Sequence, residues 1–164
     1  MLNIVLARVD SRLIHGQVVT KWLQQSNANK IVVVSDELEN DEFLQSIYLM
    51  AAPPNVEVVV KGNESIKDYA NETHDSSDKV LFLVPDLETL NNVVNQGIVN
   101  TEVQIGGLGG GPERKNVMKN INLSERDVEI LENLLAKDIN VFFQAIPEES
   151  PVPIARLIEK YKKL

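Results

Sequence analysis

Apolar residues along this chain follow two alternating patterns. Short, nearly continuous apolar runs rich in Val, Ile and Leu are typical of strands buried on both faces of a sheet. Between these runs, apolar residues recur every three or four positions, as on the buried side of an amphipathic helix. The predicted strands are residues 2–9, 30–36, 56–61, 79–84, 101–107 and 139–146. The predicted helices are residues 16–25, 41–52 and 62–71, then Leu87 to Val94, Ser124 to Leu135, and a last one from Pro151 or Pro153.

This order of elements predicts one α/β domain over residues 1–164. Strands alternating with helices through short links indicate a mostly parallel open sheet, with right-handed crossovers and helices on both faces. Ligands of such sheets bind beyond the carboxyl ends of the strands. The candidate functional loops therefore begin at Asp10, Asp36, Gly62, Pro85 and Gly106.

The predicted helices also give expectations for the core and for one helix start. Trp22, Phe43 and Tyr48 lie on the apolar stripes of their helices, so we expect them in the core. Ser124, with Asp127 three residues later, resembles a capping box.

Composition narrows the classes of function. The chain has 164 residues, and its 16 Lys and Arg against 24 Asp and Glu give a net charge of −8, which disfavours a nucleic-acid surface. It has no cysteine, so disulfides and thiolate nucleophiles are excluded. The first apolar run is short and lacks a basic leader, and no run is long enough to cross a membrane. These features predict a cytoplasmic protein.

The loop over residues 8–17 has the composition most suggestive of chemistry. It holds His15, Arg8, Arg12 and Asp10 between a predicted strand and a predicted helix. The start of a helix favours anions, a neutral imidazole is a nucleophile, and a guanidinium stabilises charge on phosphoryl oxygens. Asp10 is placed to orient either Arg12 or the ring of His15. The alternative is structural, with His15 as a capping or hydrogen-bonded residue and Asp10–Arg12 as a surface pair.

Other candidate features carry weaker signals. His74 lies in a polar stretch without metal-ligand spacing, so a solvated loop is expected there. Asp36 resembles the ribose-binding acid of a dinucleotide fold, but no glycine fingerprint precedes it, which favours a turn or cap. The segment from Gly106 to Gly111 fails both nucleotide-binding patterns because Pro112 stands where Gly or Lys is required. It is either a plain loop or a binding loop.

Residues 8–18, with the sequence RVDSRLIHGQV, resemble the first loop of the IIB components of the mannose/fructose/sorbose family of the bacterial phosphoenolpyruvate-dependent sugar phosphotransferase system. Trp22 is similarly placed in that family's first helix. Residues 50–53 (MAAP) and 105–108 (IGGL) resemble two further family motifs. The resemblance extends over essentially the whole chain, but residues 109–116 depart from the family pattern, so a role of that loop in choosing sugar or partner is not carried over.

The resemblance implies a phosphoryl relay. His15 would accept a phosphoryl group from a phosphohistidine on a IIA protein or domain, and would pass it to a sugar at membrane IIC and IID partners. Arg12 would bind the phosphoryl oxygens and Asp10 would hold Arg12 or the ring in place. Backbone amides from Ser11 to Gly16, including those of Leu13 and Ile14, would complete the cradle.

No metal or nucleotide cofactor is implied, and the protein would associate peripherally with the membrane transporter. The sugar, the phosphorylated ring nitrogen and the formation of a homo-oligomer stay open. A phosphate-responsive adaptor that passes nothing on is the alternative function, and a nucleotide-dependent enzyme is disfavoured by the glycine spacings.

Overall fold

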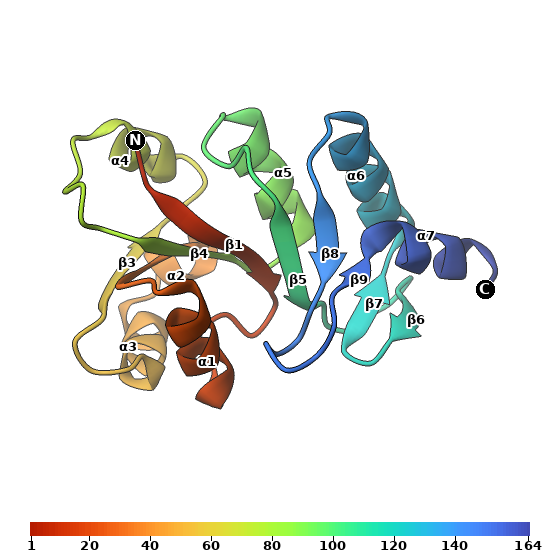
Figure 1. The fold of residues 1–164 in the computed structure, drawn as a ribbon, viewed down its shortest axis with the longest axis horizontal. Coiled ribbons are helices and arrows are strands. Elements are labelled where there is room, and N and C mark those ends of the chain that lie inside the picture. Colours follow the sequence, from red (N-terminus) through yellow and green to blue (C-terminus); the bar gives the residue numbers. More distant parts are fainter.

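A twisted seven-stranded sheet forms the centre of the computed structural model, which describes all 164 residues (Figure 1). Its strand order is β3-β2-β4-β1-β5-β8-β9, with β1 in the middle. Every pairing is parallel except that of β8 with β9, which confirms a mostly parallel α/β sheet. The strands are β1 Ile4–Asp10, β2 Lys30–Val34, β3 Glu57–Lys61, β4 Val80–Val84, β5 Val103–Gly107, β8 Val141–Phe143 and β9 Val152–Pro153.

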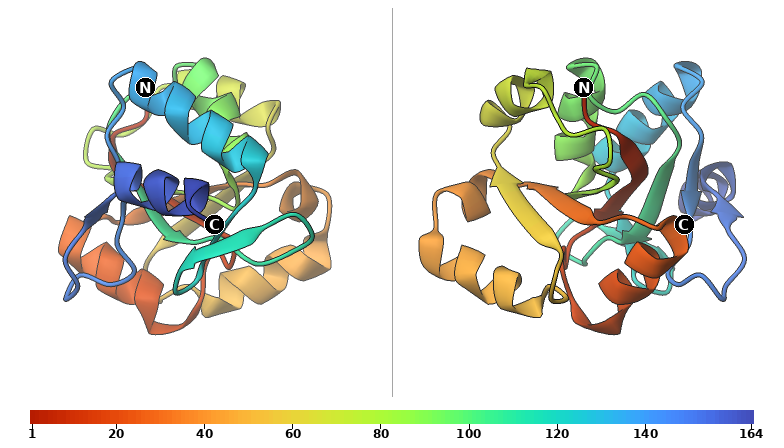
Figure 2. Two further views of the ribbon diagram at one scale, coloured as in Figure 1. Left: turned by 90° about the vertical axis from the view of Figure 1, so that its right-hand side faces the viewer. Right: turned by 60° about the vertical axis from the view of Figure 1, so that its left-hand side comes forward.

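Helices cover both faces of this sheet, as predicted (Figures 1 and 2). One face carries α1 Gly16–Ser26, α2 Asp36–Glu39 and α3 Glu42–Ala51. The other carries α4 Ser65–Asn71, α5 Leu87–Asn95 and α6 Glu125–Ala136. The last helix, α7 Ile154–Lys162, contacts a small hairpin of β6 Lys115–Met118 and β7 Ile121–Leu123. None of the helices is long and apolar enough to cross a membrane.

The two faces bury very different amounts of apolar side chain. Alternate residues of each strand point to opposite faces, so Val32 and Phe82 join one core while Ile31 and Leu81 join the other. The core beneath α4, α5 and α6 contains 28 buried residues. The core beneath α1, α2 and α3 contains nine.

Several elements differ from the sequence prediction. The strand predicted at residues 139–146 is confined to β8, and it is followed by β9, which the pattern did not predict. The short α2 and the β6–β7 hairpin were also not predicted. Elements of two to four residues are too short to show a hydrophobic period. The capping box is confirmed, since the Ser124 hydroxyl accepts from the Asp127 amide and the Asp127 carboxylate accepts from the Ser124 amide.

The expectation that Phe43 belongs to the core is wrong. Its side chain is 76% exposed, whereas Trp22 is buried and Tyr48 is half-buried. Helix α3 is apolar on more than one side, and only the side with Leu44 and Tyr48 packs against the nine-residue core. The periodic pattern alone does not distinguish the two sides.

Candidate functional site

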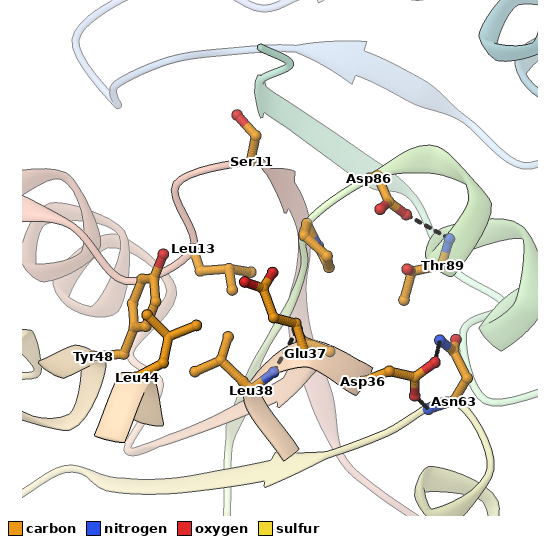
Figure 3. A pocket seen from close by; sticks show the side chains of 12 residues that line it. Ser11, Leu13, Asp36, Glu37, Leu38, Leu44, Tyr48, Asn63, Asp86 and Thr89 are labelled. Carbon is orange, nitrogen blue, oxygen red and sulfur yellow. Dashed lines mark hydrogen bonds between the residues drawn. The ribbon is translucent and has the colours of Figure 1, made fainter. Parts of the chain in front are cut away.

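The loops that follow the parallel strands surround a cleft of about 350 Å³ at the carboxyl edge of the sheet (Figure 3). Ser11 and Leu13 follow β1, Asp36 follows β2, Asn63 follows β3 and Asp86 follows β4, and all of them line the cleft. The expectation that these loops meet at one edge is therefore confirmed for the loops after β1, β2, β3 and β4, whereas the loop that begins at Gly106 does not line this cleft. The turn between β1 and α1 forms one wall.

Asp10 is the buried centre of that turn. Its side chain has no exposed surface, and its Oδ1 accepts from the backbone N–H and from Nε of Arg12, each at 3.0 Å. Its Oδ2 accepts from Nη2 of Arg12 at 3.0 Å and from Nη2 of Arg8 at 3.3 Å. Nε2 of His15 is 3.9 Å from Oδ2, beyond hydrogen-bond distance. Of the two partners that the sequence left open, Asp10 therefore orients Arg12.

The Arg12 guanidinium is hydrogen-bonded along one edge and exposed to solvent along the other. Its Nε and Nη2 atoms form a bidentate pair with Asp10, while 44% of the side chain is exposed. A guanidinium has five N–H donors in a fixed plane, so the remaining donors are free to bind an anion. The pair with Asp10 fixes the direction in which those donors point.

Arg8 lies beside the turn and contacts Asp10, although the sequence assigned it no role. Its buried guanidinium donates to the Gln104 side-chain oxygen and to the carbonyl oxygens of Gln144 and Ala145, the last two at 2.9 and 3.0 Å. It also lies 5.3 Å from the ring centre of Trp22, whose Nε1 donates to the same Ala145 carbonyl. Burial lowers the pKa of Arg8 from its ordinary value to about 10, with the nearby Asp10 charge acting in the opposite direction. Arg8 therefore remains a cation at neutral pH and ties β1 to β5 and to the segment after β8.

His15 occupies the N-cap position of α1 and is mostly buried. Its Nδ1 is 3.0 Å from the carbonyl oxygen of Leu13, and its Nε2 is buried without a hydrogen-bond partner. The ring makes no capping hydrogen bond to the helix, so of the two structural roles only the hydrogen-bonded one, with the Leu13 carbonyl, is present. Leu13 has a positive φ of 53°, a conformation that costs a non-glycine residue about 1–2 kcal/mol. This strained turn brings the Leu13 carbonyl to the imidazole ring.

The backbone amides of the turn divide into two groups. Those of Ser11 and Leu13 donate to the carbonyls of Gly107 and Asp10, at 3.0 and 2.9 Å. The amides of Ile14 and Gly16 donate to no protein acceptor. Gly16 has a φ of 47°, and the first turn of a helix directs such free N–H groups toward a bound anion. Free amides are therefore restricted to the C-terminal half of the turn, while Ser11 is one of the residues that line the cleft.

Two glycines of the segment from Gly106 to Gly111 make room for the arginines. A Cβ atom on Gly106 would overlap the guanidinium of Arg8, and one on Gly107 would be 3.0 Å from Nη2 of Arg12. Both glycines belong to β5, next to β1. The glycine pair is thus part of the site's packing, which neither the plain-loop nor the binding-loop interpretation included.

The remaining candidates have local structural roles. Asp36 opens α2, and it accepts hydrogen bonds from the backbone and side chain of Asn63, which lower its pKa. His74 places its Nε2 2.7 Å from the Tyr69 carbonyl, and its ring contacts the Tyr69 ring edge-on. It is half-buried, so the expected solvated loop is only partly right. No group of three or more His, Asp or Glu side chains is arranged to hold a metal ion.

Comparison with known proteins relates this geometry to a family. Residues 4–164 match the family model described as the PTS system sorbose subfamily IIB component. The chain belongs to this family of phosphotransferase-system IIB components. Such a component transfers phosphoryl groups during sugar uptake and is a sugar phosphotransferase component.

Individual relatives agree with this assignment. The sorbose-specific EIIB component of Klebsiella pneumoniae is 30% identical, with 93% of each chain covered. The mannose-specific EIIAB component of Escherichia coli K12 is 31% identical, and the match covers 96% of this chain but 49% of that protein. The crystal structure of manxB from Thermoanaerobacter tengcongensis superposes with a TM-score of 0.89 at 37% identity and 96% coverage of both chains. The fold of this IIB component is therefore that of solved structures over nearly its whole length.

Proposed function

We propose that this IIB component carries the phosphoryl group on His15 and receives it from a phosphohistidine of a IIA protein or domain. The E. coli relative bears both A and B designations in its name, which supports a IIA donor for the present chain. In the first transfer a ring nitrogen of His15 forms a bond to phosphorus as the N–P bond of the donor breaks. The bonding electron pair returns to the donor ring, which takes up a proton while His15 gives up the proton on its other nitrogen, so both rings end uncharged.

In the second transfer a sugar hydroxyl attacks the phosphoryl group at a complex with membrane IIC and IID components. An O–P bond forms, the N–P bond to His15 breaks, and the released ring takes up the proton that the hydroxyl loses. The protein acts in the cytoplasm at the surface of that complex. The named relatives act on mannose and on sorbose, so a hexose is the expected class of acceptor.

The observation that carries this proposal is that Arg12 and His15 both approach the same oxygen of Asp10, with Nη2 of Arg12 at 3.0 Å and Nε2 of His15 at 3.9 Å from Oδ2. Asp10 holds one edge of the guanidinium by two hydrogen bonds and leaves the other exposed. An exposed, oriented fork next to an imidazole and free helix amides suits a phosphoryl group, whose charge is spread over three oxygens. Ser11, Ile14 and Gly16 would complete the binding site. The amide of Leu13 already donates to the Asp10 carbonyl, so it would hold the turn in shape.

The test is phosphoryl uptake from labelled phosphoenolpyruvate through the general relay proteins and IIA. Wild-type protein should acquire an acid-labile, base-stable label, and His15→Ala should acquire none. Label on His15→Ala would overturn the assignment of the carrier. The matched control is His74→Ala, which removes the other histidine and should label normally.

Arg12→Lys keeps the charge but loses the fork, so it should slow labelling while sparing the fold, which the far-ultraviolet circular dichroism spectrum checks. An unchanged rate would remove Arg12 from the mechanism.

A further inference from the structure

Helix α3 exposes an apolar stripe that nothing in the fold covers. Phe43, Ile47 and Met50 follow one another at helical spacing and are 76%, 49% and 86% exposed. No residue of this helix is fully buried. Scattered exposed apolar residues are ordinary, but three large ones in a row on one helix indicate a binding surface.

Acidic side chains border this stripe. Residues 31–60 contain six carboxylates and no Lys or Arg, so most of the chain's net charge of −8 originates there. Exposed carboxylates include Glu37 on α2, Asp41 at the N-cap of α3 and Glu42 in its first turn. We call the apolar stripe and these three carboxylates the α3 surface.

Helix α3 also forms part of the wall of the cleft beside the phosphoryl-transfer turn. Leu44 and Tyr48 project from the other side of α3 and line that cleft together with Ser11 and Leu13 (Figure 3). The cleft also includes Glu37, which belongs to the acidic border. A partner bound to α3 and to Glu37 would therefore lie near the cleft that Ser11 and Leu13 line.

We propose that the α3 surface docks the basic cytoplasmic loops of the membrane-embedded sugar component, with apolar residues of those loops seated on the stripe. This inference rests on the proposed function, which requires such a partner. Cytoplasmic loops of membrane proteins carry an excess of Lys and Arg, so their charge complements this border.

The same charge argues against two other occupants. A bilayer with anionic lipids would repel an acidic surface. A second copy of the chain on this surface would place like charges opposite each other, which destabilises an interface.

The experiment measures docking and phosphorylation separately. Docking is measured as co-sedimentation with inverted membrane vesicles that contain the cognate IIC and IID proteins, and with liposomes of the same lipids without protein. Phosphorylation is measured as label uptake from phosphorylated IIA. Wild type should sediment with the protein-containing vesicles only, and less so as salt rises, because screening weakens the charge attraction.

The stripe is tested with the triple variant Phe43→Gln, Ile47→Gln and Met50→Gln, because Gln favours helix and the three sites are exposed. We expect label uptake at the wild-type rate and co-sedimentation reduced by roughly tenfold or more. Undiminished co-sedimentation would overturn the proposal. Lost uptake with retained co-sedimentation would also overturn it, because the surface would then dock the IIA donor.

The border is tested with Glu37→Gln and Glu42→Gln together. The matched control is Glu129→Gln with Glu132→Gln, two exposed residues of α6 on the opposite face. The first pair should weaken co-sedimentation and reduce its salt dependence, and the control should do neither. Equal effects of the two pairs would show that only net charge matters and would refute a localised surface.

The remaining outcomes concern other occupants and the proposed function itself. Equal sedimentation of wild type with bare liposomes would assign the surface to lipid. A wild-type dimer in light scattering that the triple variant abolishes would assign it to a second copy. Failure of wild type to take up label would overturn the proposed carrier, while the sedimentation measurements would still decide the docking surface.

Discussion

Replacing Arg8 by Met should destabilise the protein more than the same replacement at any exposed arginine. Methionine retains the length and apolar contacts of the stem but removes every donor. The side-chain oxygen of Gln104 and the carbonyl oxygens of Gln144 and Ala145 then lose the donors that the structure provides. Asp10 keeps its bidentate partner Arg12.

Two opposing contributions set the magnitude. An unsatisfied buried acceptor costs about 1–3 kcal/mol, so three of them cost about 6 kcal/mol. Burial lowers the pKa of Arg8 to about 10, so the buried cation is itself unfavourable, and the neutral side chain relieves part of that cost. The expected net loss is about 3 kcal/mol, which for a protein of this size lowers the melting temperature by about 6–12 °C.

Urea denaturation followed by far-ultraviolet circular dichroism measures this loss. Fluorescence is less suitable because Trp22, the single tryptophan, packs against Arg8 and would change its signal. The control is Arg126→Met, where the guanidinium is exposed and bonds only to exposed carboxylates, and its midpoint should match wild type. A loss below about 1 kcal/mol in Arg8→Met, with an unchanged slope, would show that the three acceptors find other partners and would refute the reasoning.

Two further predictions test the neighbourhood of the site. Gly106→Ala places a Cβ atom on the Arg8 guanidinium, so it should clearly lower the unfolding midpoint. The control is Gly110→Ala, whose new Cβ would have its nearest neighbouring atom 3.9 Å away and should leave the midpoint unchanged. Equal midpoints of the two variants would contradict the packing role of Gly106. Asn63→Ala should raise the pKa of Asp36 toward its ordinary value, because the Asn63 side chain is the main cause of its lowering. Since the folded-state pKa is depressed, the stabilisation is complete above the ordinary carboxyl pKa and is lost as pH falls through the depressed value. Carboxyl NMR titration measures this, and an unmoved pKa would assign the effect to the backbone bond alone.

The parts of the fold that depend on local periodicity were predictable from the sequence. The long helices and the apolar strands match their predicted positions closely, as α1 and β4 illustrate. Short elements such as α2 and β9 contain too few residues to show a period, so tertiary contacts alone define them.

The candidate site was predictable only where its residues adjoin in sequence. The loop from Asp10 to Gly16 is such a case. The contacts of Arg8 with Gln104 and Gln144 span 96 and 136 positions, which no local pattern encodes. A signal was nonetheless present, because an arginine within a run expected to be buried on both faces must find buried acceptors.

The unequal cores have a consequence for motion. A layer that buries nine apolar residues opens at a lower free energy than one that buries 28, and such differences define units that exchange their amide hydrogens at different rates. The turn with His15 belongs to the lighter layer, with α3 as its most weakly anchored helix. The layer with 28 buried residues can thus hold β1 fixed. The layer with nine can change its conformation, first to bind a donor and then to bind an acceptor. A relay protein binds its donor and its acceptor in succession. A more easily deformed layer on the face that contacts both partners would let the same turn fit each of them.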